Sequence, residues 1–164
     1  MSNNALLLGD GNTITRQNLN LVPVPAPTKS YTPVPWSLFV DTLEAHVTNA
    51  GYDVSNLKMT CSGIEKATGW PRELFGVMSL DRPGTFIEPL SGEGFEVGHA
   101  GLRPQIAFRS SYNHHYAPAA CAGASVMVCS NGEMHGDFMV VLRKQTTYVL
   151  NDLDRLVSDG VGQI

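Results

Sequence analysis

One stretch of the chain, residues 103–144, combines basic side chains with aromatic and imidazole rings. Cationic side chains bind phosphates and rings stack on unpaired bases, and proteins that hold single-stranded nucleic acid use both groups together. The sequence therefore predicts a binding surface for single-stranded DNA. Its residues are Arg103, Arg109, Tyr112, His114, His115, Arg143 and Lys144.

Zinc binding is a second chemistry that this stretch suggests. His114, His115, Cys129 and His135, with His99 before them, are residue types that bind zinc. Structural zinc sites show short paired spacings such as CxxC, whereas adjacent histidines in an extended loop point apart. We therefore predict no metal site and no cofactor.

Nucleophilic catalysis is a third possibility. Ser110 and Ser111 precede His114, and Asp137 follows at the far side of a predicted hairpin. A catalytic triad is recognised by its geometry, and the chain has no GxSxG turn that would present a serine. We therefore predict a protein that is not an enzyme, with no catalytic residues.

The predicted site residues lie on or between strands. Apolar residues alternate over 104–112, which predicts a strand with Arg109 on its outer side. Residues 119–129 are apolar at both alternating sets of positions, which predicts one strand in a sheet that is covered on both faces. Asn131-Gly132 predicts a tight hairpin turn, and the returning strand spans 137–143.

The rest of the chain supplies two helices and two further strands. Apolar residues at helical spacing predict helices at 36–50 and 147–160, and alternation predicts strands at 52–61 and 72–80. The glycine-rich residues 81–103 form a long connection. The predicted fold is an α+β domain with a mainly antiparallel sheet of about five strands.

Residues 1–35 are expected to form an extended N-terminal arm before a single domain at 36–164. Residues 21–35 contain five of the ten prolines, and proline favours an extended backbone. The arm is either a linker or a segment that packs along the domain or on a neighbouring subunit, because valines and Tyr31 between the prolines have apolar surface to bury.

The composition is that of one globular domain. The 164 residues are 43% hydrophobic and 16% charged, and the formal net charge is −4. This charge argues against a broad basic surface that binds duplex DNA, although it permits a local basic groove.

Sequence features also bear on location. Three cysteines on strand-like segments predict reduced thiols, which is typical of the cytoplasm. No apolar run approaches the ~20 residues that span a bilayer, and the N-terminus lacks the pattern of a signal peptide. We therefore predict a cytoplasmic protein without membrane contacts.

Five short segments stand out by their order and spacing: YTPVP (31–35), FGV (75–77), RSSYN (109–113), GASVMVCSNG (123–132) and VLRKQTTYVL (141–150). Together they resemble domain-of-unknown-function family 932, whose members are carried by phages and plasmids. The resemblance covers roughly residues 30–160, and many members of the family are longer than this chain.

The resemblance implies an accessory protein of a mobile element in a bacterial host, and it supplies no established catalytic residues. The predicted order of strands and helix over 104–160 is also similar to the cores of single-strand annealing proteins. By this analogy, we expect this protein to form a homo-oligomer and to act in DNA metabolism. The alternative is a protein-interaction or inhibitor module that acts on a host or phage protein without binding nucleic acid.

Overall fold

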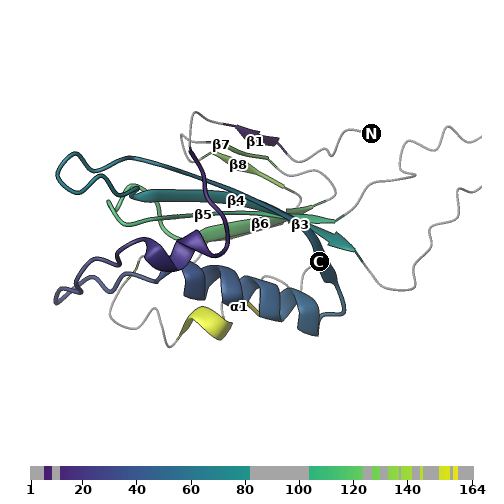
Figure 1. The fold of residues 1–164 in the computed structure, drawn as a ribbon. Coiled ribbons are helices and arrows are strands. Elements are labelled where there is room, and N and C mark those ends of the chain that lie inside the picture. The colour runs from purple at the N-terminus through teal and green to yellow at the C-terminus, as the bar shows by residue number, and fades with distance from the viewer. Residues whose placement is uncertain are drawn as a thin grey trace, which may run out of the picture.

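Two β-sheets and one long helix make up the described part of the chain (Figure 1). The computed structural model of the protein describes residues 6–8, 12–81, 104–123, 127–129, 133–136, 138–141, 145, 152–155 and 157–158. In chain order, its elements are β1 (Leu6–Leu8), β2 (Asn12–Thr13), the 3-10 helix η1 (Asn18–Leu21), α1 (Trp36–Asn49), β3 (Asp53–Ser62), β4 (Glu73–Asp81), β5 (Gln105–Ser111), β6 (Ala119–Gly123), β7 (Met127–Cys129), β8 (Met134–His135) and β9 (Phe138–Val141).

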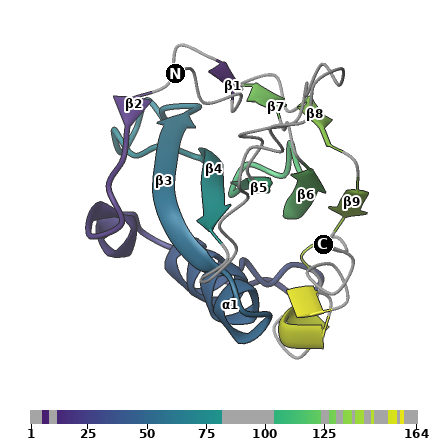
Figure 2. The ribbon, with the colours of Figure 1, turned by 90° about the vertical axis from the view of Figure 1, so that its right-hand side faces the viewer.

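The larger sheet has the strand order β2-β3-β4-β5-β6-β9, and all neighbouring strands in it are antiparallel (Figure 2). β2 contributes two residues at the edge, so five longer strands carry the sheet. Every residue of β4 except the last is buried, as expected for a strand covered on both faces. The predicted α+β fold with a mainly antiparallel sheet is confirmed.

The helix α1 covers one face of the large sheet, and it confirms the helix predicted at 36–50. Pro35 precedes its first residue, and Gly51 follows it with a φ of 88°, a left-handed conformation that suits glycine. The residues that α1 buries recur every three or four positions, which places them on one side of a helix. They are Trp36, Phe39, Val40, Leu43 and Val47.

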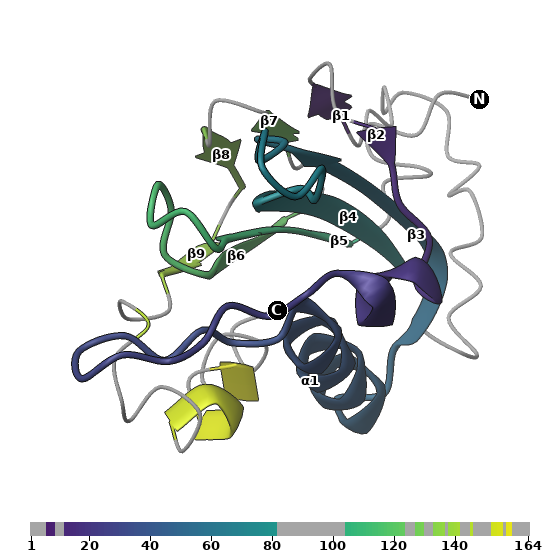
Figure 3. The ribbon, with the colours of Figure 1, turned by 60° about the vertical axis from the view of Figure 1, so that its left-hand side comes forward.

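A second helical segment lies beside α1 (Figure 3). Residues 152–155 and 157–158 are helical, and the other residues of the helix predicted at 147–160 lie outside the described part of the chain. Leu153 and Val157 join the core beneath α1. Nε2 of His46 lies 2.8 Å from Oδ1 of Asp154, which ties the two helical segments together.

The small sheet, made of β1, β7 and β8, covers the other face of the large sheet (Figure 1). β1 is parallel to β7, and β8 is antiparallel to it. A second apolar core lies between the two sheets. Its buried residues are Phe75, Val77, Ala107, Ala119, Cys121, Val128 and Met134. The large sheet is therefore covered on both faces.

The prediction of one continuous strand over 119–129 is wrong. The first half of the segment is β6 in the large sheet and the second half is β7 in the small sheet, and the returning segment is divided in the same way into β8 and β9. A Cβ added to Gly136, between β8 and β9, would lie 2.9 Å from the carbonyl oxygen of Ala122. The two segments, β6 with β7 and β8 with β9, therefore cross from one sheet to the other at a contact that leaves no room for a side chain at position 136. The predicted turn at Asn131-Gly132 lies outside the described residues.

Residues 12–35 lie along the domain. β2 pairs with the end of β3, and η1 follows it near the start of α1. Besides Pro33, five residues of this segment are buried, and all but Tyr31 belong to the core that α1 covers. They are Ile14, Leu19, Val22, Tyr31 and Val34. The proline-rich segment thus buries Val22, Tyr31 and Val34 against the domain, whereas Val24 is 43% exposed.

Candidate ligand site at the end of the large sheet

A buried carboxylate organises one end of the large sheet, where the β3–β4 turn and the β5–β6 loop meet (Figure 1). Glu73 begins β4 and is 7% exposed. Its carboxylate accepts hydrogen bonds from Ser62 Oγ at 2.7 Å and from Asn113 Nδ2 at 2.8 Å, and it lies 2.8 Å from His115 Nδ1. Burial alone would raise the pKa of Glu73, but these hydrogen bonds outweigh burial and hold it below its usual value.

The loop between β5 and β6 is fixed by its own hydrogen bonds. The backbone N–H of His115 donates to Asn113 Oδ1 at 3.2 Å, and the backbone N–H of Tyr116 donates to Ser111 Oγ at 2.9 Å. His114 has a φ of 63°, an uncommon backbone conformation for a residue other than glycine. Such strain persists where the surroundings hold the backbone, and it is concentrated at ligand sites.

A cavity of about 460 Å³ lies against this loop. The rings of Tyr31 and His114 contact each other on its wall, with 4.0 Å between their centroids. The hydroxyl of Tyr31 is buried and has no hydrogen-bond partner among the residues that the structure describes. The cavity is lined by Ser30, Tyr31, His114, His115, Tyr116, Ala117 and Gln145.

Gln145 joins three segments at the back of this cavity. Its side-chain amide donates to the carbonyl oxygen of Ser111 at 2.9 Å, and its side-chain oxygen accepts from the backbone N–H of Val34 at 2.9 Å. Both ends of the amide are therefore used, and Gln145 holds the N-terminal segment against the end of β5.

Arg109 lies on the face of β5 that the small sheet covers, next to this site. Its guanidinium carbon is 5.2 Å from the centroid of the Tyr116 ring, which is a cation–π distance. The Nε atom is buried, and no group in the described part of the chain forms a hydrogen bond with it. Arg109 is therefore close to the loop ring of Tyr116, on a covered face of the sheet and not on the outer side of the strand that the alternation predicts.

Tyr112 does not lie on the surface where we expected a stacking ring. It is 5% exposed, belongs to the core under α1 and stacks on Trp36 with 4.4 Å between ring centroids. Its hydroxyl accepts the backbone N–H of Trp36 at 3.0 Å, and burial raises its pKa well above the usual value. Tyr112 therefore anchors the start of α1 and is closed to a ligand. Arg103, Arg143 and Lys144 lie outside the described residues.

We expect Tyr112→Phe to lower the free energy of unfolding by about 1–2 kcal/mol, because the buried N–H at the start of α1 loses its acceptor while the ring stack stays. Urea unfolding followed by tryptophan fluorescence measures this loss. Tyr31→Phe is the matched control, since it removes a buried hydroxyl that has no partner within the described ranges. Equal losses in the two variants would contradict the capping role.

Cys61 and Cys121 are poor nucleophiles and poor ligands. Burial raises the pKa of Cys121 to about 11 and also raises the pKa of Cys61, so both thiols stay protonated near neutral pH. Within the described residues, no three His, Cys, Asp or Glu side chains lie close enough to share a metal ion.

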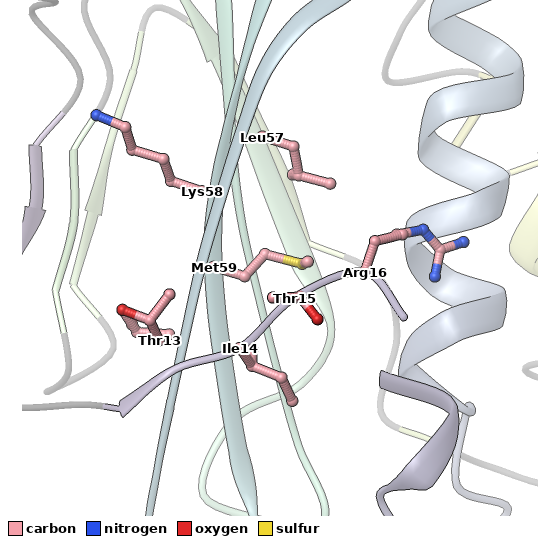
Figure 4. Close-up of a pocket in the computed structure, with 8 residues that line it drawn as sticks. Thr13, Ile14, Thr15, Arg16, Leu57, Lys58 and Met59 are labelled. Carbon is pink, nitrogen blue, oxygen red and sulfur yellow. The ribbon is translucent and has the colours of Figure 1, made fainter. Parts of the chain in front are cut away.

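A second cavity, of about 500 Å³, lies where residues 13–16 cross the edge of β3 (Figure 4). Arg16, Leu57 and Met59 point toward α1, and Lys58 points to the opposite side of the sheet. The Arg16 guanidinium pairs with carboxylates of α1, Asp41 and Glu44. This cavity therefore has apolar walls and an arginine that is already paired. It offers fewer polar groups to a ligand than the cavity beside His114.

The sequence did not indicate Glu73, Ser62, Asn113, Tyr31 or Gln145 as site residues. One signal was available: Glu73 is the one charged residue between Arg72 and Asp81 in an otherwise apolar strand, and a buried charge needs partners.

Comparison of the chain with models of known protein families, with curated proteins and with solved structures gave no match. The resemblance to domain-of-unknown-function family 932 therefore stays a prediction. None of the helices in the described part of the chain has the length and apolar character that crossing a bilayer requires.

Proposed function

We propose that the protein is a non-enzymatic accessory protein of a phage or plasmid that binds single-stranded nucleic acid at the end of the large sheet. The ring-lined cavity beside His114 is the observation that carries this proposal. Rings stack on any base, so a surface of this kind binds single strands with little sequence preference.

Charge supports a short binding site. The net charge of −4 is unfavourable for a long phosphate backbone, so binding must depend on local cations. Arg109 is the described cation that lies against a ring of the site, Tyr116. A phosphate next to a base that stacks at this loop would meet the Arg109 guanidinium.

We expect a labelled single-stranded oligodeoxynucleotide to bind in low-salt buffer, and we expect Arg109→Gln to weaken the binding about fivefold, the effect of one lost contact of about 1 kcal/mol. The slope of log affinity against log salt concentration should fall by about 0.7, the value for one phosphate contact in a single strand. Fluorescence anisotropy across a salt series measures both.

Lys58→Ala is the matched control, because Lys58 is an exposed cation on β3, away from the site. It should leave the affinity and the salt slope unchanged. If no oligonucleotide binds in low-salt buffer, or if Lys58→Ala and Arg109→Gln weaken binding equally, the proposed site is wrong.

A second candidate function is protein interaction, and one observation favours it. Three of the large apolar side chains that are exposed in the described residues lie on η1, just after it, and in the first turn of α1: Leu21 at 63%, Val24 at 43% and Leu38 at 42%. Sedimentation analysis separates the two candidates. Large oligomers that persist with a bound oligonucleotide would support an annealing-like function, whereas a monomer or dimer without nucleic-acid affinity would support an interaction module.

A further inference from the structure

We propose that the cavity beside His114 takes one unstacked nucleobase of the bound strand and reads its hydrogen-bonding edge through the Tyr31 hydroxyl and the His115 imidazole. This inference rests on the proposed function and names the part of the ligand that enters the site. Phosphate contact and base contact are then made by different residues, so each can be removed separately.

The volume and the walls of the cavity fit a planar ligand. About 460 Å³ lies within the usual range of small-molecule sites, roughly 300–1,000 Å³. The ring-bearing residues His114, His115 and Tyr116 line it, and the side chain of His115 is 63% exposed. The left-handed backbone of His114 holds its ring against Tyr31 at the wall of the cavity.

The unpaired Tyr31 hydroxyl is the observation that points to a ligand. Tyr31 is 9% exposed and lines the cavity, yet its hydroxyl has no hydrogen-bond partner in the described structure. A buried polar group without a partner is unfavourable, and the polar edge of a ligand would satisfy it. A hydroxyl both donates and accepts, so it suits the mixed donors and acceptors of a base edge.

Glu73 fixes how His115 meets the ligand. The carboxylate holds Nδ1 of His115 at 2.8 Å, so Nδ1 carries the proton and Nε2 is the ring nitrogen that a ligand can bind. In the neutral imidazole, Nε2 is an acceptor, and it pairs with the amino or imino N–H that every base carries on its pairing edge. The pair therefore selects a ligand that brings an N–H group.

The test compares two single-stranded oligonucleotides of equal length, one with all its bases and one made of abasic residues throughout, each bound to the full chain and its variants. The unsubstituted protein should bind the complete oligonucleotide about tenfold more tightly, because stacking of one base contributes enough binding free energy for a change in affinity of roughly that size. Tyr31→Phe should lose about fivefold on the complete oligonucleotide and nothing on the abasic one.

The stability of Tyr31→Phe provides the second readout. A role confined to ligand binding predicts weaker binding with no loss in the free energy of unfolding, because the removed hydroxyl has no hydrogen-bond partner among the described residues of the free protein. Equal binding of both oligonucleotides, with no effect of Tyr31→Phe, overturns base insertion and leaves the proposed function standing. If neither oligonucleotide binds, the proposed function and this inference both fail.

Discussion

Gly76→Ala is expected to lower the free energy of unfolding by about 3 kcal/mol, the upper end of the usual cost of overfilling a core. Gly76 lies in the middle of β4 and pairs directly with Phe108 of β5. A Cβ added at Gly76 would lie 2.6 Å from Cε2 and 2.8 Å from Cε1 of the Phe108 ring, and closer still to Cζ. The ring would have to leave its position.

The surroundings give the Phe108 ring little room to move. Its side chain is fully buried, and the ring meets the edge of Phe39 on α1 with 6.0 Å between centroids. Displacement of the ring therefore pushes on α1, and the cost of Gly76→Ala extends beyond the two paired strands. Urea unfolding of the variant measures this cost.

A double-mutant cycle with Phe108→Leu tests the steric cause. Leucine ends at Cδ and lacks the Cε and Cζ atoms that an alanine at 76 would meet. Gly76→Ala should therefore cost much less in the Phe108→Leu protein than in the unsubstituted one. An equal cost in both backgrounds would show that the glycine is needed for its backbone and not for the space it leaves.

The parts of the fold that the sequence predicts well are those with local periodicity. Alternating apolar residues placed β3, β4 and β5, and helical spacing with Pro35 and Gly51 placed α1. The crossing of the β6–β9 ribbon between two sheets was missed, because the apolar pattern of 119–129 continues across it. Gly136, between β8 and β9, approaches Ala122 of β6 closely, and a contact between two strands of the fold cannot be inferred from the apolar pattern of one segment.

The candidate site shows the same limit. His114 and His115 were expected at the site because they stand in a polar loop next to tyrosines, and the structure places both beside the cavity. Tyr112 was predicted to be a ring of the binding surface, although strand alternation places it on the face opposite to Arg109, three residues earlier. Glu73, Tyr31 and Gln145 reach the site from distant parts of the chain, and only the tertiary fold brings them there.

Glu73→Gln is expected to lower the free energy of unfolding at pH 7 by about 2 kcal/mol, the usual worth of a hydrogen bond to a charged group. Three side chains, Ser62, Asn113 and His115, direct polar groups at this carboxylate. Glutamine keeps the shape but removes the charge and turns one acceptor into a donor. Glu65→Gln is the control, because Glu65 pairs with Arg72 at the surface, where ion pairs contribute little.

The pH dependence of this loss identifies the charge as its cause. The pKa of Glu73 in the folded protein lies below the usual value of 4.5, so the unfolded chain binds a proton more readily. Its contribution to stability is therefore complete above about pH 4.5 and is lost as the pH falls through the lower folded-state pKa. The difference between the unsubstituted protein and Glu73→Gln should shrink over that range in unfolding experiments. A difference that stays constant down to the lowest pH would instead assign the loss to packing around the side chain.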